Sequence, residues 1–406
     1  MTARSAVTVT RAPVLSTAAE AVAAARAYAA SIADGAIERD RAGTVPYAEL
    51  AALDASGLLG ITVPAAYGGP DLPPTALAEV IRTIAAVDPG IAQIPQAHFL
   101  FVDVLAVHGS REQQQRLFAD VLAGARLGNG VAERGGKHAQ DLKTRLHAGA
   151  PPRLEGRKYY CTGAISARWI GVSALDDADR LVLAFVDRHA PGVAIDEDWN
   201  VMGQRDTVSG TATFDQVPVE PGLVVPYADA FEVPQQFGAR SQLVHTAIQV
   251  GIAGGALRDA RAFVRTMARP FFEATRAGWA DTAATDPHTI HRFGRLAVQV
   301  RAAEALLAAA AATLGEVTRF PGGAGEAARG SIAVAEAKAF ASDTAVEVAS
   351  DLFSLAGASA ADERYDLSRH WRNARTHAGH DPVDWKYHHV GNYLLNDAFP
   401  PNHGQL

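Results

Sequence analysis

The fold is decided by residues 241–267, SQLVHTAIQVGIAGGALRDARAFVRTM, which predict one long helix. The same helical signal returns in three later stretches: Ile290–Thr318, Gly330–Ala356 and Trp385–Leu395. Helices of about 25 residues span about 38 Å at 1.5 Å per residue. That is the length of a long four-helix bundle. We therefore expect residues 229–406 to form a C-terminal helical bundle.

A short β section precedes this bundle. The runs Leu181–Val186, Gly192–Ile195 and Gly210–Phe214 are β-prone and are separated by Asp, Pro and Gly. Because the character of the sequence changes after Gly124, we expect residues 125–228 to form a middle β domain.

The first third of the chain is predicted to be helical. The alanines of Thr17–Ile37 favour a helix because alanine has the best intrinsic helix propensity. Similar patterns follow at Tyr47–Gly57, Thr75–Val87, Gln96–His108 and Glu112–Ala123. The expected fold class is α+β, with an N-terminal helical domain over residues 1–124, the middle β domain, and the C-terminal four-helix bundle.

Composition narrows the class of protein. A chain of 406 residues with 48% hydrophobic content fits a globular enzyme. The formal net charge of -7 gives no broad basic surface, so nucleic acid is not expected as a partner. The single cysteine, Cys161, permits no internal disulfide and suits a reducing cytoplasm.

Neither a membrane span nor a signal peptide is expected. Residues 1–13 have no apolar core of signal-peptide length, and the later apolar stretches are alanine-rich helices interrupted by charge. Alanine-rich faces such as Ala302–Ala312 bury little area per residue, so we expect a homo-oligomer. A monomer with tight alanine packing is the alternative.

The segment Arg369–Pro382 holds three arginines and three histidines within 14 residues. Such a concentration of cationic and titratable groups predicts a site that handles an anion, a proton transfer or both.

Several motifs resemble the acyl-CoA dehydrogenase superfamily. Tyr67-Gly68-Gly69 follows Ile61–Pro64, and Trp199–Arg205 precedes a strand rich in Ser, Thr and Gly. The helical, β, helical order matches as well. In that family a flavin lies between the β domain and the C-terminal bundle of a tetramer, so the resemblance implies a bound flavin and a homotetramer.

Within this superfamily the chain looks most like the flavin-dependent monooxygenases, especially the desulfurisation enzymes of the dibenzothiophene monooxygenase type. The resembling segments are Trp371–Asn373, Arg375–His377, His380–Val383, Lys158–Gly163 and Ile94–Leu100. The resemblance implies a two-component enzyme. Reduced FMN arrives from a separate flavin reductase, reacts with O2 as co-substrate and forms a C4a-hydroperoxyflavin. This species oxidises sulfur, nitrogen or a ring in a small, largely apolar organic compound.

The resemblance also implies catalytic residues. His98 and His380 are expected beside the reactive edge of the flavin, where imidazole can donate or exchange a proton near neutral pH. Thr162 is expected to supply a hydroxyl to the same region and to contact the cofactor. The alternative for His98 is a hydrogen-bonded histidine on a mostly apolar helix.

Two arginines are candidates for the FMN phosphate. Arg372 and Arg375 lie three residues apart and can share one helix face, from which they would present fork-shaped donors. Ion pairs with Glu363 or Asp366 are the alternative.

Three further residues complete the implied cofactor site. Asn129 is expected to contact the flavin ring, or to be a turn-forming asparagine. Arg292 is expected to contact the flavin of an adjacent subunit, or to be a solvated surface arginine. His377 either contacts the flavin or supports its segment.

Other functions remain open. An FAD-dependent acyl-CoA dehydrogenase would use Asp381 as its base, but the side chain is one methylene shorter than the family's glutamate, and a displacement of about 1 Å costs on the order of a hundredfold in rate. The glycine-poor turn Leu355–Ser359 favours FMN over FAD. A non-catalytic binding protein on the same fold is a further alternative.

Neither a metal site nor a hydrolase site is expected. Adjacent His388 and His389 would point about 100° apart on a helix, without a clustered third ligand. Ser166, Ser173 and Cys161 lack the context of a nucleophile elbow.

Overall fold

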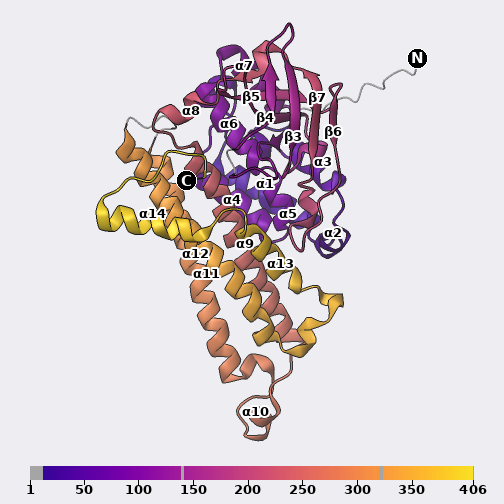
Figure 1. The fold of residues 1–406 in the computed structure, drawn as a ribbon. Helices are drawn as coiled ribbons and strands as arrows, with labels where there is room; N and C mark the ends of the chain where they lie inside the picture. Colours follow the sequence, from indigo (N-terminus) through magenta and orange to yellow (C-terminus); the bar gives the residue numbers. More distant parts are fainter. Residues whose placement is uncertain (1–11, 139–140, 318, 320–322, 406) are drawn as a thin grey trace, which may run out of the picture.

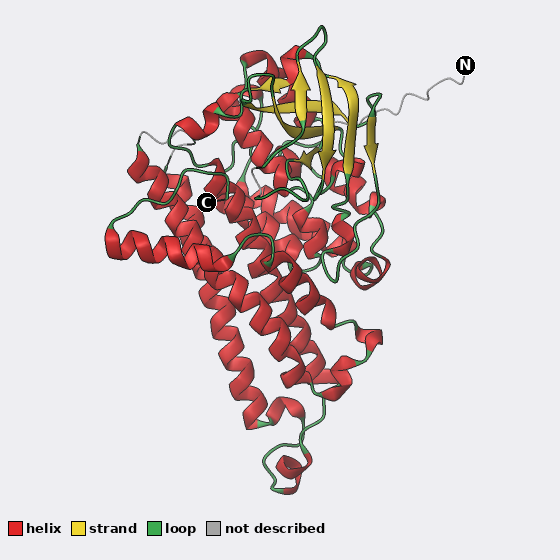
Figure 2. Ribbon diagram, in the orientation of Figure 1, coloured by secondary structure: helices red, strands yellow, loops and turns green. Residues whose placement is uncertain are grey.

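The computed structural model describes residues 12–138, 141–317, 319 and 323–405. A sheet caps one end of the molecule, and long helices project from the other end (Figures 1 and 2). The predicted order of helical, β and helical sections is confirmed. The expectation that residues 1–13 carry no signal peptide falls almost wholly outside the described residues.

The N-terminal section contains seven helices among the described residues: α1 (Ala18–Ile32), α2 (Ala36–Ala42), α3 (Tyr47–Ala55), α4 (Pro74–Ala85), α5 (Pro89–Gln93), α6 (Gln96–His108) and α7 (Arg111–Leu122). Local sequence starts several of them. The Thr17 side chain accepts a hydrogen bond from the Glu20 backbone at the start of α1. Ser110 and Gln113 form a capping box at the start of α7.

The middle section forms one twisted sheet. Its strands are β1 (Leu127–Gly130), β2 (Arg145–His147), β3 (Arg153–Lys158), β4 (Trp169–Leu175), β5 (Leu181–Asp187), β6 (Val193–Ile195), β7 (Ala212–Pro218) and β8 (Val224–Val225). The strand order is β6-β7-β3-β2-β4-β5-β8, and β1 pairs with β4 in parallel. Helix α6 packs closely on β4. The contact leaves no room for a side chain at Gly171, whose Cβ would lie 2.7 Å from the Phe101 ring.

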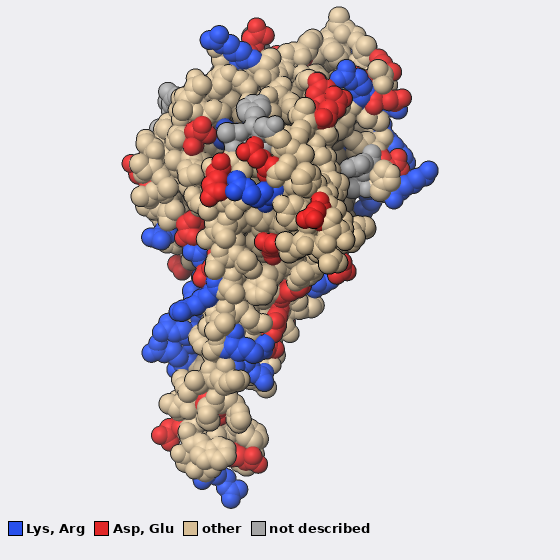
Figure 3. Space-filling model, turned by 90° about the vertical axis from the view of Figure 1, so that its left-hand side faces the viewer, with Lys and Arg blue, Asp and Glu red and all other residues tan. Residues whose placement is uncertain are grey.

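The C-terminal section consists of α8 (Asp229–Glu232), α9 (Phe237–Thr266), α10 (Phe272–Arg276), α11 (Pro287–Glu316), α12 (Ala324–Ala356), α13 (Ser368–Ala378) and α14 (Val383–Asn396). Helices α9, α11 and α12 run along the projection, and α10 lies at its tip (Figure 1). In the view of Figure 3 basic side chains gather on the upper part of this narrow projection, and acidic side chains lie at its tip.

The N-terminal and C-terminal helices share one hydrophobic core. Buried side chains of α4 such as Leu77 and Ile81 belong to the same cluster as Val244 of α9 and Leu352 of α12. Close backbone approach contributes, since a Cβ at Gly255 of α9 would lie 2.5 Å from the Ala86 carbonyl oxygen. The predicted domain boundaries at residues 124 and 228 lie where helices give way to strands and strands to helices. These boundaries stay a prediction.

Two helical stretches are long and apolar enough, by length and composition alone, to cross a membrane. In Pro89–His108, 83% of the most apolar window is buried inside the protein, which is typical of a core helix. In α11 only 33% of that window is buried. The outer face of α11 therefore exposes apolar surface to whatever surrounds the chain.

Candidate active site

Three imidazoles converge where α5, α9 and α13 meet. We call His245, His377 and His380 the histidine cluster. Nδ1 of His245 lies 3.2 Å from Nε2 of His377, and the same Nε2 lies 3.2 Å from Oε1 of Gln93. The rings of His245 and His380 have centroids 4.0 Å apart and are inclined by 40°. The structure thus brings together two predicted site histidines and a third that the sequence did not single out.

The members of the histidine cluster differ in burial and therefore in their ability to take up a proton. The pKa values of His245 and His377 are lowered well below 6.5, first by burial and then by nearby cationic groups that include Lys338 and His380. Both are therefore neutral at pH 7. The side chain of His380 is 41% exposed, so it is the member of the cluster that can exchange protons with solvent.

Asp381 holds the His380 ring through a hydrogen bond. Nδ1 of His380 donates to Oδ1 of Asp381 at 3.3 Å, and the ammonium groups of Lys386 and Lys338 lie 2.9 and 3.5 Å from the carboxylate. Burial alone would raise the pKa of Asp381, but Lys338, the hydrogen bond from His380, and Lys386 hold it well below its usual range. The carboxylate therefore stays ionised and fixes Nδ1–H of His380.

A chain of buried hydroxyl groups reaches the same junction from the β section. Oγ1 of Thr162 lies 2.7 Å from Oγ of Ser209, which lies 2.8 Å from Oγ1 of Thr207. Thr207 in turn donates to the Gln204 carbonyl oxygen at 2.8 Å. We call Thr162, Ser209 and Thr207 the hydroxyl chain.

The loop that carries Thr207 and Ser209 packs directly on α13. The backbone N–H of Gln204 donates to Oδ1 of Asn373, and a Cβ at Gly203 would lie 2.1 Å from the Arg372 carbonyl oxygen. Asn373 and His377 are four residues apart and so share one face of α13. The hydroxyl chain and the histidine cluster are therefore held by the same helix.

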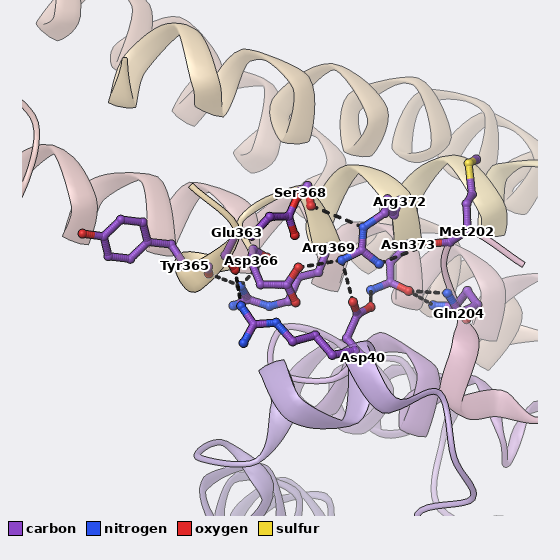
Figure 4. A network of polar contacts seen from close by, with 11 residues as sticks. Asp40, Met202, Gln204, Glu363, Tyr365, Asp366, Ser368, Arg369, Arg372 and Asn373 are labelled. Carbon is purple, nitrogen blue, oxygen red and sulfur yellow. Dashed lines mark hydrogen bonds and ion pairs between the residues drawn. The ribbon is translucent and has the colours of Figure 1, made fainter. Parts of the chain in front are cut away.

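Arg372 occupies the centre of a structural network (Figure 4). Its guanidinium donates to Asp40 at 2.6 Å and to Asp366 at 2.7 Å, and also reaches the Met202 carbonyl oxygen. These contacts disfavour a phosphate role for Arg372, which stays a prediction. Both carboxylates already occupy its donors, as the ion-pair alternative with Asp366 anticipated, and the residue ties α13 to α2 and to the Gly203 loop.

Arg375 behaves differently from Arg372. It is exposed, and its side chain forms no hydrogen bond or ion pair with any residue in the described part of the chain. It lines a cavity of about 660 Å³ between α12, α13 and α14, together with Trp371 and Tyr387. Arg375 is thus the arginine of this segment with donors available for a phosphate.

The two arginines make a matched test. Arg372→Met should lower the free energy of unfolding by about 2 kcal/mol, because it strands Asp40 and Asp366, while FMN affinity stays within about twofold. Arg375→Met should leave stability unchanged and weaken FMN binding roughly tenfold, by loss of a charge-assisted hydrogen bond. Urea unfolding and FMN titration by fluorescence measure both. If Arg372→Met weakened FMN binding and Arg375→Met did not, Arg372 would be the ligand of the phosphate.

The structure shows the surroundings of Asn129 and Arg292, and their contacts with a flavin stay predictions. The Asn129 side chain accepts from the Val131 backbone and donates to the Tyr160 carbonyl oxygen, as a turn-forming asparagine does. Its backbone N–H donates to the Thr162 carbonyl oxygen, which places it next to the hydroxyl chain. Arg292 is exposed near the start of α11 and contacts no acidic group among the described residues.

His98 is a core residue. It is fully buried, its Nδ1 accepts from the Leu127 backbone N–H at 3.2 Å, and its Nε2 lies 2.9 Å from the Leu59 carbonyl oxygen. Both ring nitrogens are therefore committed to the backbone. These contacts favour the sequence-based alternative of a hydrogen-bonded histidine, and the catalytic role of His98 stays a prediction.

His98 makes stability depend on pH. Burial lowers its pKa to about 4, whereas an unfolded histidine titrates near 6.5. Between these values the unfolded chain binds a proton that the folded chain does not, so the contribution of neutral His98 is fully present above pH 6.5 and is lost as pH falls towards 4. His98→Gln should therefore show a smaller drop in melting temperature between pH 7 and pH 4.5 than wild type. An equal drop would contradict this account.

Unmatched buried acceptors at the junction fit a polar heterocycle. Oε1 of Gln242, Oε1 of Gln249 and Nδ1 of His377 are buried without a hydrogen-bond partner among the described residues. Buried polar atoms are rarely left unpaired. The isoalloxazine of a flavin presents both donors and acceptors, and FMN carries one phosphate, for which the unpaired guanidinium of Arg375 is a candidate partner. The residues present therefore fit FMN.

Comparisons with known proteins identify the family of this chain. Models of the acyl-CoA dehydrogenase N-terminal and C-terminal domains match residues 17–125 and 243–385. Dibenzothiophene monooxygenase of Rhodococcus erythropolis is 34% identical over 93% of this chain and 94% of its own. The probable FMNH2-dependent monooxygenase SfnC of Pseudomonas putida is 32% identical over 94% of this chain and 96% of its own. The solved FMN-bound TdsC from Paenibacillus sp. A11-2 superposes with a TM-score of 0.90 at 30% identity, covering 95% of this chain and 100% of that one.

The fold and these matches define a class: the chain belongs to the acyl-CoA dehydrogenase superfamily. Within that class, the two full-length relatives above are named a dibenzothiophene monooxygenase and a probable FMNH2-dependent monooxygenase. The predicted family and fold class are thereby confirmed.

Proposed function

We propose that this chain is an FMN-dependent monooxygenase that uses reduced FMN and O2 to transfer one oxygen atom to a small organic substrate. The observation that carries the proposal is the junction of the histidine cluster and the hydroxyl chain, with buried acceptors left for a heterocycle. Full-length relatives whose names include FMNH2-dependent and dibenzothiophene monooxygenases support the same class.

The cofactor supplies oxygen activation, and the chain supplies binding, orientation and proton handling. Because Asp381 accepts from Nδ1–H of His380, Nε2 is the nitrogen of His380 left to exchange a proton. Neutral His377 offers Nδ1 as an acceptor. Thr162 presents a hydroxyl held by Ser209, and Asn129 lies beside it. Together these groups would hold the flavin ring and move protons at its edge.

The dehydrogenase alternative is disfavoured by the state of Asp381. A general base works best with a pKa near the operating pH, whereas the pKa of this carboxyl lies well below its usual range between two ammonium groups. It is also 4% exposed. The carboxylate therefore serves as an anchor for His380 and the lysines.

We further propose a two-component, cytoplasmic homotetramer that receives reduced FMN from a separate flavin reductase. The outer face of α11 leaves Val298 68% exposed and Ile290 55% exposed, and a neighbouring subunit would cover it. Arg292 lies on the same exposed helix, so that neighbour's flavin is its proposed partner. The lone cysteine, Cys161, is buried and suits a reducing compartment.

The test is rapid mixing of the protein, loaded anaerobically with reduced FMN, against oxygenated buffer while the flavin spectrum is recorded. A transient spectrum that outlasts the oxidation of free reduced FMN supports the proposal. Oxidation indistinguishable from free FMN, together with no reduced-flavin binding, overturns it. A parallel titration with FAD and an acyl-CoA distinguishes the dehydrogenase alternative.

A further inference from the structure

His245 is a buried polar residue in an apolar stretch of α9. It is 1% exposed, and its chain neighbours Leu243, Val244, Ala247 and Ile248 all belong to the hydrophobic core. Burying an imidazole is costly unless it is hydrogen-bonded. Its polar contact is with His377, so the reason for a histidine at this position lies in the histidine cluster.

The hydrogen-bond pattern assigns the protons of the two buried rings. The amide oxygen of Gln93 can only accept, so Nε2 of His377 carries the hydrogen that it shares with Oε1 of Gln93 and Nδ1 of His245. Nδ1 of His245 is then an acceptor. Nδ1 of His377 remains a buried lone pair without a partner among the described residues.

His245 also supports the exposed member of the cluster. Its ring lies against the ring of His380 at a centroid distance of 4.0 Å, while Nδ1 of His380 bonds to Asp381. The imidazole of His380 is thus confined by a ring contact from α9 and by a hydrogen bond from its own loop.

We propose that His245 is a positioning residue for the proposed monooxygenase reaction, acting through His377 and His380. It holds His377 from α9 while Gln93 holds the same nitrogen from α5, so Nδ1 of His377 points in one direction. It also prevents the His380 ring from turning towards α9. The proposal rests on the proposed function for the identity of the reaction, but the contact itself belongs to the chain.

Two substitutions separate the two contacts. His245→Phe keeps a ring against His380 but removes the acceptor for His377. His245→Asn keeps an acceptor near the Nδ1 position but removes the ring. His370→Asn is the matched control, because His370 is also buried between α13 and α9 but pairs with Asp259, away from the cluster.

Two readouts are needed for each variant. The first is the split of steady-state oxygenation into kcat and KM, with the FMN dissociation constant. The second is the Cε1–H nuclear magnetic resonance signals of His377 and His380 in flavin-free protein with labelled histidine. The second readout does not depend on catalysis, so it reports the contact even if the proposed function fails.

His245→Phe is expected to lower kcat by about tenfold to a hundredfold, with KM and FMN affinity within about twofold, since small misplacements of reacting groups act mainly on rate. The His377 signal should move in the flavin-free protein. His245→Asn should keep that signal near its wild-type position and regain part of kcat. His370→Asn should leave kcat and the His377 signal unchanged.

An unmoved His377 signal in His245→Phe would overturn the positioning contact, whatever the activity. An equal loss of kcat in His370→Asn would also overturn the proposal, because it would show a general loosening of α9 against α13. A moved His377 signal in a chain that oxygenates nothing would reject the monooxygenase function and retain the contact. If His245→Phe does not fold, His245→Leu carries the same two measurements.

Discussion

His380→Ala should lower the rate of substrate oxygenation by about 10² to 10⁴, the usual range for loss of a general acid or base. His380 is the exposed member of the histidine cluster, and Asp381 leaves its Nε2 free for proton exchange. Neither partner is expected to replace it, because His245 and His377 are buried and do not exchange protons with solvent. Affinity for FMN should change by no more than about twofold, since binding draws on other groups.

The measurement is substrate oxygenation at saturating reduced FMN, with the rate of flavin oxidation recorded in parallel. His388→Ala is a suitable control, since His388 is an exposed histidine of the neighbouring helix α14 that contacts Trp385 and His389. It should retain the wild-type rate. An unchanged oxygenation rate in His380→Ala would remove this residue from the mechanism.

Asp381→Asn should reduce the free energy of unfolding by about 3 to 5 kcal/mol, the range seen when one partner of a buried ion pair is removed. The substitution keeps the size of the side chain but leaves Lys338 and Lys386 buried without a carboxylate. Lys338 is 1% exposed and has no hydrogen bond of its own among the described residues. Urea unfolding at fixed protein concentration gives the difference.

The same variant should change the acid limb of stability. An unfolded Asp titrates near 3.9, and the folded pKa of Asp381 lies well below that. Its stabilising contribution is therefore present above about pH 4 and is lost as pH falls further, through the folded pKa. Asp384→Asn, an exposed neighbour, should match wild type at every pH. If the two variants have the same free energy of unfolding at every pH, the buried Asp381 carboxylate does not contribute to stability in this way.

Much of the fold could be predicted because its elements are locally encoded. The expected helix at Gln96–His108 agrees with α6, and Ser241–Met267 lies almost wholly within α9. Strands β1 to β4 and β8 were not predicted. Strand β1 has only four residues, and β4 is buried on both faces. These two strands therefore do not show the alternation of apolar and polar residues that marks a half-exposed strand.

The site was predictable only in part. The density of arginine and histidine in Arg369–Pro382 pointed to the segment that holds two members of the histidine cluster, but sequence does not show which guanidinium has a carboxylate nearby. Asp40 lies 332 residues from Arg372 along the chain, so that ion pair is invisible without the fold. His245 was missed for the same reason. A lone histidine in the apolar run Leu243–Val250 was the available signal.

The shared core of the N-terminal and C-terminal helices has a consequence for how the protein is made. Helix α4 emerges from the ribosome long before α9 and α12, whose side chains complete its packing. Until then its apolar face must be shielded from aggregation. The oxygenating site, which needs α5, the Gly203 loop and α13 together, would form only after residues up to about 380 are free to fold. Nascent chains that end earlier are expected to be clients of chaperones and to lack any partial activity.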